Sequence, residues 1–210
     1  CKNAATISGS KAVGGIVGYS DGASVAGCAN TGAVSATGRQ VGGIAGNMEN
    51  SSIQNCYNTA AIKADGTYAG GIAGRAAYGS SVGNSYTTGS VQASNYCFAV
   101  VAQGYNSNPC KINKVYALGG TAESLYPASG VTISDCEFKT DAEMKASDFA
   151  KLLGDAFMVK AGDYPALTWE TPTAKVAFTL SPENAVLTIG GNTYTGSCEV
   201  ALAAGSYDYT

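Results

Sequence analysis

A fixed spacing of 28 residues is the feature that most constrains the fold of this chain. The segments VGGIVG at 13–18, VGGIAG at 41–46, AGGIAG at 69–74 and CFAVVA at 97–102 each begin 28 residues after the one before. A constant period with short β-type pieces and turn residues between them is the sequence signature of a solenoid. The sequence therefore predicts an all-β parallel β-helix of about 28 residues per coil.

Apolar residues recur with the same period, so the stacked coils are expected to build inward columns. Equivalent residues of neighbouring coils in a parallel β-helix lie about 4.8 Å apart and bury one another. The predicted columns are Val34, Ile62 and Val91; Val25, Ile53, Val82, Ile112 and Ile133; and Ile16, Ile44, Ile72 and Val100.

Glycine is abundant, with 28 among the 210 residues, and this argues against helices in the repeated part. Each glycine in a helix interior costs about 1 kcal/mol. Paired glycines such as Gly14 and Gly15 fit tight corners or places where backbone approaches backbone. Parallel β crossovers are almost always right-handed, so a right-handed solenoid is expected over residues 1–138.

The pattern changes after about residue 139, and residues 139–171 are expected to cap the solenoid. Residues 141–153 indicate a helix with Asp141 as the N-cap, and its apolar stripe is Met144, Phe149, Leu152 and Leu153. Such a helix covers the exposed strand edges at the end of a solenoid. Residues 164–169 predict a last extended piece, with Trp169 packed against it.

Residues 172–210 alternate between apolar and polar side chains, which predicts a small antiparallel β module. Gly190 and Gly191 indicate a hairpin turn within it. About 39 residues make a marginal independent core, so this segment is interpreted as the truncated start of a sandwich-like module.

The unit GGI(V/A)G followed by S(I/V)xN(C/S)Y(N/T)TG resembles the GLUG repeat of bacterial secreted and cell-surface proteins. The resemblance covers residues 1 to about 119, with a degenerate coil to about 138, and the fourth copy departs from the motif at Phe98 and Ala99. The stretch MKASDF…YPALTW resembles the segment that closes such arrays, and residues 174–210 resemble the start of a PEGA-like or bacterial Ig-like module. These resemblances imply a secreted or surface, adhesin-like context and transfer no catalytic residue.

Composition excludes several kinds of chemistry and several partners. The chain has no histidine, so the commonest general base and metal ligand are missing. Ser20 and Ser81 lie in matches to the nucleophile elbow G-x-S-x-G, but a triad without a base is not a catalyst. A net charge of −3 gives no basic surface for nucleic acid, and no apolar run approaches the ~18 residues of a membrane helix. We expect no catalytic residue, cofactor or metal.

Tyr57, Tyr86 and Tyr116 share one repeat position and are therefore expected to stack. An exposed stack of amphipathic rings is a possible binding stripe for a glycan or a protein. The favoured interpretation is that the stack packs the wall of the solenoid.

The predicted function is a non-enzymatic structural and adhesion module, either a stiff spacer or a solenoid that presents a ligand site. We expect a monomer on the cell surface or secreted, with a host or bacterial surface protein or a glycan as its partner. The alternative is a carbohydrate-binding or carbohydrate-active β-helix of the pectate-lyase type, which needs clustered Asp, Arg or Lys. The charged residues of 1–113 show no carboxylate pair in the sequence.

Several cysteines occupy one repeat position, which Ser85 and Val115 fill in other coils. A position that accepts Cys, Ser and Val requires a small side chain, and free cysteine is among the most buried residue types. Cys28, Cys56 and Cys136 are therefore expected to be reduced and buried. The single disulfide left open is Cys97–Cys110, across the irregular fourth coil. Cys198 has no evident partner.

Overall fold

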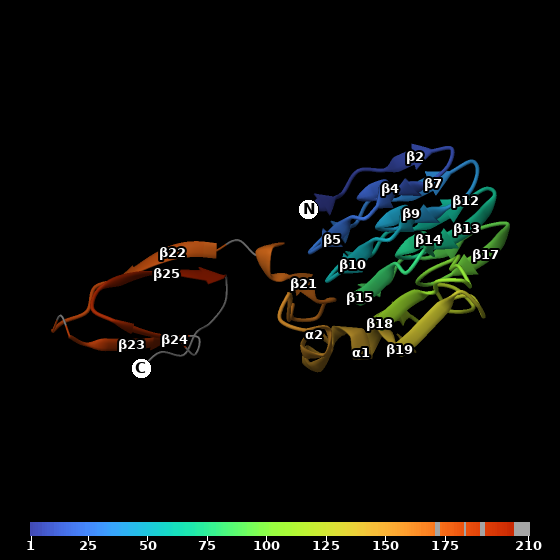
Figure 1. Cartoon of the computed structure of the whole chain (residues 1–210). Coiled ribbons are helices and arrows are strands. Elements are labelled where there is room, and N and C mark those ends of the chain that lie inside the picture. The colour runs from blue at the N-terminus through green and yellow to red at the C-terminus, as the bar shows by residue number, and fades with distance from the viewer. Residues whose placement is uncertain (171–172, 183, 190–191, 204–210) are drawn as a thin grey trace. The chain divides into compact units, whose positions relative to one another are not determined.

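Parallel strands from successive repeats lie on one another through most of the chain (Figure 1). The computed structural model describes residues 1–170, 173–182, 184–189 and 192–203. Its contacts group into two units, Cys1–Leu167 and Thr168–Thr210. Val13 pairs with Val41, and Val41 pairs with Ala69, so one coil takes 28 residues. The predicted β-solenoid is confirmed.

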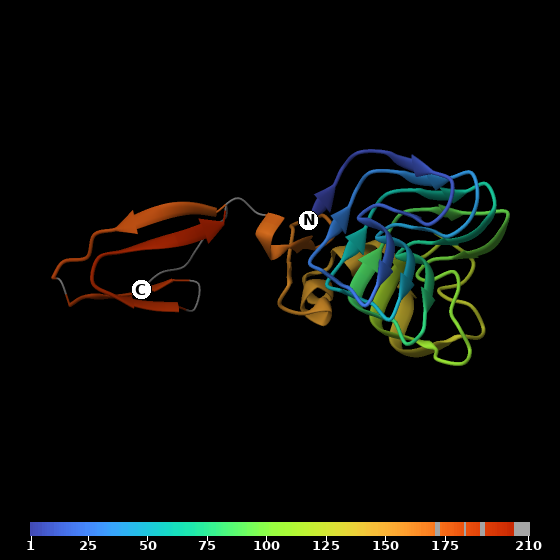
Figure 2. The same ribbon diagram turned by 45° about the horizontal axis from the view of Figure 1, so that its top comes forward.

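Each coil contributes strands to parallel sheets, named A to D, that form the sides of the solenoid (Figure 2). Sheet A holds β1 (Lys2–Asn3), β5 (Ser24–Ala26), β6 (Ala29–Asn30), β10 (Ser52–Gln54), β11 (Tyr57–Asn58), β15 (Ser81–Thr87), β18 (Cys110–Leu118) and β19 (Val131–Lys139). Sheet B holds β2 (Ile7–Gly9), β7 (Val34–Ala36), β12 (Ile62–Ala64) and β16 (Val91–Gln92). Sheet C holds β3 (Val13–Gly14), β8 (Val41–Gly42), β13 (Thr67–Gly70) and β17 (Asn95–Phe98). Sheet D holds β4 (Val17–Asp21), β9 (Ala45–Glu49) and β14 (Ala73–Ala77).

The three predicted columns lie in register, and their central members are buried. Ile44, Ile53 and Ile62, one from each column, have almost no exposed surface. The column ends differ: Val25 is half-buried and Ile133 is 43% exposed. Each of these two residues pairs with a coil on one side only, so no equivalent residue of a further coil covers its other side.

The paired glycines lie where the backbone of one coil closely approaches both the next coil and a buried polar side chain. A Cβ on Gly43 would lie 2.2 Å from the carbonyl oxygen of Gly71 and 2.4 Å from Cγ of Asn58. Asn58 belongs to a buried ladder, in which Asn30 Nδ2 donates to Asn58 Oδ1 at 2.8 Å and Asn58 Nδ2 donates to Thr87 Oγ1 at 3.3 Å. The glycine is required for close approach, which confirms one of the two reasons expected from the sequence.

The capping segment contains two short helices, α1 (Asp141–Lys145) and α2 (Ser147–Leu153), where one helix was expected. Ala146 between them has extended backbone. The prediction that Asp141 is the N-cap was wrong, because Thr140 caps α1 in a reciprocal capping box with Glu143. Leu152, assigned to the apolar stripe, is exposed. None of the helices in the described part of the chain is long and apolar enough to cross a membrane.

The chain closes the first unit with a short antiparallel pair, β20 (Phe157–Met158) and β21 (Ala166–Leu167). The expected extended piece at 164–169 is therefore only partly strand, since Thr168–Glu170 forms a 3-10 helix. Trp169 was expected to pack against it, but half of its surface is exposed.

The second unit is a small antiparallel β module, as predicted. β22 (Thr173–Phe178) pairs with β25 (Cys198–Ala203), and β23 (Val186–Ile189) pairs with β24 (Asn192–Thr195). Leu187, Ile189 and Val200 form its buried cluster. The predicted turn at Gly190 and Gly191 lies outside the described residues.

We predict that Gly43→Ala destabilises the protein by about 3 kcal/mol, because the added methyl overlaps backbone that no rotamer change can relieve. Gly119→Ala is the matched control, since its nearest neighbour is the Lys139 carbonyl oxygen at an ordinary 3.6 Å. The control is expected to change stability by less than about 0.5 kcal/mol. Urea unfolding followed by circular dichroism measures both. Equal midpoints for the two variants would show that the corner is not tightly packed.

Candidate binding surfaces

The three tyrosines expected to form a stripe lie in register, but they are buried. Tyr57 pairs with Tyr86, and Tyr86 pairs with Tyr116, in the register of sheet A. The first two rings are parallel within 8°, with centroids 5.1 Å apart. The three side chains are only 6%, 1% and 2% exposed. They are therefore not a surface on which a ligand could rest.

The capping segment covers this tyrosine column. Phe149 of α2 contacts the rings of Tyr86 and Tyr116 edge-on, at centroid distances of 5.8 and 5.5 Å. The hydroxyl of Tyr86 donates a hydrogen bond to the carbonyl oxygen of Pro165 at 2.5 Å. Burial raises the pKa of Tyr116 to about 12, chiefly by desolvation. The column thus packs the solenoid wall against its cap, as the favoured interpretation held.

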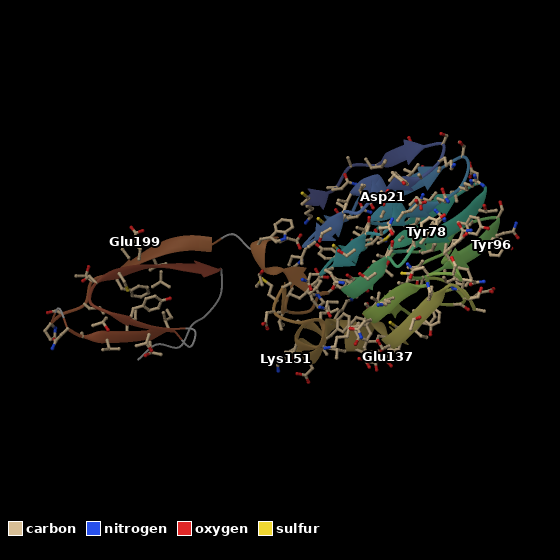
Figure 3. The ribbon with its side chains drawn as sticks, in the orientation of Figure 1. Asp21, Tyr78, Tyr96, Glu137, Lys151 and Glu199 are labelled. Carbon is tan, nitrogen blue, oxygen red and sulfur yellow. The ribbon has the colours of Figure 1, made fainter. Side chains whose placement is uncertain are left out.

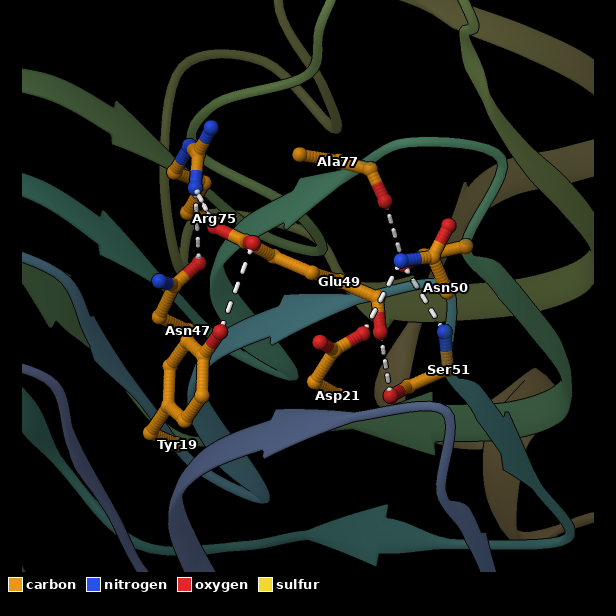
Figure 4. Close-up of polar contacts among 9 residues, drawn as sticks. Tyr19, Asp21, Asn47, Glu49, Asn50, Ser51, Arg75 and Ala77 are labelled. Carbon is orange, nitrogen blue, oxygen red and sulfur yellow. Dashed lines mark hydrogen bonds and ion pairs between the residues drawn. The ribbon is translucent and has the colours of Figure 1, made fainter.

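Sheet D carries a polar ladder that the linear sequence conceals (Figure 4). Asp21 of β4 and Glu49 of β9 are register partners, and Arg75 of β14 is the register partner of Asn47 on β9. The sequence-based expectation of no clustered carboxylate pair did not anticipate that Asp21 and Glu49 are register partners. The reason is the coil period, which puts residues 28 positions apart next to each other.

Both carboxylates of this ladder are already engaged. Arg75 Nη1 forms an ion pair with Glu49 Oε1 at 2.5 Å, and the Tyr19 hydroxyl donates to Glu49 Oε2 at 3.3 Å. Asn50 Nδ2 donates to Asp21 Oδ1 at 2.9 Å. In the described part of the chain, no group of three or more His, Cys, Asp or Glu side chains could hold a metal ion. The ladder links three coils and offers little free acid or base chemistry.

A second set of tyrosines lies at the corners of the third and fourth coils. Tyr68 and Tyr96 stack with centroids 4.9 Å apart and planes within 14°. Tyr78 and Tyr105 form a tilted pair, also at 4.9 Å. Tyr96 belongs to β17 and is 56% exposed at the edge of the solenoid (Figure 3). These rings lie at the surface, in contrast to the column beneath the cap.

Three of these corner tyrosines, Tyr68, Tyr96 and Tyr105, border a groove of about 520 Å³ that opens to solvent. Its lining consists of Tyr68, Tyr96, Ala102, Gln103, Gly104, Tyr105, Asn106, Ser107, Pro127 and Ser129. This surface was not predicted from the sequence. The signal was present, since Tyr68 and Tyr96 are separated by one coil period.

The cysteines are the remaining nucleophile candidates, and all seven are free. Cys28 and Cys56 are buried as expected, whereas Cys136 is half-buried because it lies on the last coil strand, β19. The disulfide left open between Cys97 and Cys110 is not formed, since Cys97 pairs into sheet C and Cys110 into sheet A. Burial raises the pKa of Cys56 and Cys110 to about 12.

We predict that iodoacetamide at pH 8 labels the exposed Cys1 quickly and leaves Cys56 and Cys110 unlabelled until the protein unfolds. Their neutral thiols stabilise the fold fully below pH 9, the ordinary value, and that contribution is lost as the pH rises toward 12. Labelling of these two residues should accelerate in that interval. Mass spectrometry of digested samples measures each site, and rapid labelling of Cys56 at pH 8 would contradict the buried column.

Comparison with known proteins agrees with the repeat. Residues 9–35 and 37–63 each match the family model described as the GLUG motif. Each match runs about once around the solenoid: the first begins at the end of β2 and the second just after β7, and both pass through sheets C, D and A to the next strand of sheet B. No curated protein and no solved structure matches the chain. The repeated part is therefore similar to the GLUG motif, and one motif corresponds to one coil.

Proposed function

We propose that the chain is a non-enzymatic structural module of a secreted or cell-surface bacterial protein, in which the solenoid is a stiff spacer that presents binding surfaces. The observation that carries this proposal is the continuous hydrogen bonding between coils. Ile16 N donates to Ile44 O at 3.1 Å, Ile44 N to Ile72 O at 2.9 Å, and Ile72 N to Val100 O at 2.9 Å. Bending one coil therefore breaks bonds to its neighbours.

The resemblance to the GLUG repeat supports the extracellular setting, and with it an adhesive role toward a surface protein or a glycan. A monomeric module is also part of the proposal. The last coil strand, β19, carries Asp135, Glu137 and Lys139. Charged side chains on an outer strand discourage edge-to-edge pairing between copies.

A carbohydrate-active β-helix is the second candidate, and the pairing of Asp21 with Glu49 is the observation in its favour. Glycoside cleavage by two carboxyl groups needs one to donate a proton while the other attacks or activates water. Here Arg75 neutralises Glu49, and Asn50 holds Asp21. The structural role is better supported because these side chains stabilise the ladder between coils.

For the spacer, we predict that hydrogen exchange of the full chain finds the central-coil amides, such as those of Ile44 and Ile72, protected by one common free energy close to that of global unfolding. The physical reason is that each amide bonds to the next coil, so opening is cooperative. Amides of the exposed turn residues Asn106 and Ser107 provide the internal control and should exchange much faster. Mass spectrometry of peptic fragments measures both sets.

Exchange of the Ile44 and Ile72 amides within seconds would contradict a stiff spacer. The extracellular setting has its own test, in which an antibody against the solenoid is applied to intact and to permeabilised cells of the source organism. Equal labelling of both supports surface display. Labelling that requires permeabilisation would contradict it, whatever the exchange data show.

A further inference from the structure

The geometry points to a neutral oligosaccharide as the ligand of the groove bordered by Tyr68, Tyr96 and Tyr105. This inference deepens the proposed presenting role of the solenoid and rests on it. The groove volume of about 520 Å³ lies within the range of 300–1,000 Å³ that is usual for small-ligand sites.

The backbone at these tyrosines is the first argument. Tyr68, Tyr78 and Tyr96 have φ of 67°, 53° and 57°, in the left-handed region that bulky side chains rarely adopt. The first-coil and second-coil equivalents of Tyr96, Ala12 and Gln40, also have positive φ, so the corner itself imposes this geometry. Glycine or asparagine would fit the corner with less strain. Exposed tyrosines in strained positions therefore indicate a role for the rings beyond folding.

The free face of Tyr96 is the second argument. Tyr68 stacks on one face of this ring, and no described aromatic residue stacks on the other. The fourth coil is the last one with a strand in sheet C, so the tyrosine ladder ends there. Tyr105, which packs on Tyr78, lines the same groove. A flat apolar ligand face, such as the axial C–H side of a sugar ring, fits such an aromatic platform.

Charge is the third argument, and it selects a neutral ligand. The polar side chains of the groove are Gln103, Asn106, Ser107 and Ser129 together with the tyrosine hydroxyls, and none of the lining residues is Asp, Glu, Lys or Arg. Arg75 lies 5.5 Å from the ring centre of Tyr78, which packs on Tyr105, and Glu49 already pairs with this cation. Amides and hydroxyls both donate and accept hydrogen bonds, as sugar hydroxyls do.

A proline-rich peptide is the other ligand that aromatic grooves accept. Such a peptide presents carbonyl acceptors but no donors along a run of prolines. The serine hydroxyls and amide oxygens of the groove also offer acceptors, which a run of prolines leaves unpaired. The lining therefore favours the oligosaccharide.

The test uses the full 210-residue chain and isothermal titration calorimetry. The neutral probes are cellohexaose, xylohexaose, mannohexaose and laminarihexaose; the comparison probes are hexagalacturonate and decaproline. Tyr96→Asn removes the ring and keeps a residue that tolerates the left-handed backbone. Tyr105→Ala removes the second ring of the groove, and Tyr19→Ala removes an exposed tyrosine of sheet D as the matched control.

We expect at least one neutral hexasaccharide to bind, with affinity unchanged within twofold between 50 and 500 mM NaCl because no charged side chain lines the groove. Tyr96→Asn and Tyr105→Ala should each lower that affinity at least tenfold, and Tyr19→Ala should leave it within twofold. Circular dichroism tests whether each variant is folded. If Tyr96→Asn does not fold, the affinity of the folded Tyr105→Ala variant decides the test.

The inference is overturned if none of the neutral probes binds at 5 mM, or if hexagalacturonate or decaproline binds more tightly than all of them. It is also overturned if both folded groove variants bind like the unchanged protein. These outcomes leave the spacer proposal standing, because hydrogen exchange and surface labelling do not involve the groove.

Discussion

Close approach between glycine backbone and a buried polar side chain is the constraint on which the rest of this solenoid depends. The second glycine of each pair leaves room for Asn30, Asn58 or Thr87 from another face of the solenoid. The two asparagines bond to one another along the stack and also donate to backbone carbonyls two residues ahead. Such buried amides are stabilising only when fully paired. The corner therefore fixes the register of each coil on the next.

Once the register is fixed, the structure places residues one coil apart in contact, and this rule generates each of its surfaces. It buries Tyr57 under the cap by stacking it on Tyr86. On sheet D the same rule places Asp21 beside Glu49 and Asn47 beside Arg75, and the Arg75 side chain reaches across to Glu49. At the corners it sets exposed tyrosines side by side. Whether a stack of side chains belongs to the core or to the surface therefore depends on which side of the solenoid it occupies and on how deeply it is buried, more than on residue type.

Much of this could be predicted because the period and the apolar columns are visible along the sequence. The errors arose where the outcome depends on a neighbour in space. Ile133 and Cys136 occupy inward positions, yet both remain partly exposed on the last coil strand. Thr140 rather than Asp141 caps the first helix, because its hydroxyl and backbone meet Glu143 reciprocally. Cys97 and Cys110 are near in sequence but belong to different sheets.

The sequence by itself determined the coil length, the inward columns, the glycine corners and the presence of a helical cap, since each follows from local periodicity and stereochemistry. Only the tertiary structure decided which tyrosines are reachable. The cap folds over the column of Tyr86, whereas the corner of Tyr96 remains open. The physical reason is that exposure depends on which segment packs on a face, and the sequence period of the coils does not specify that segment.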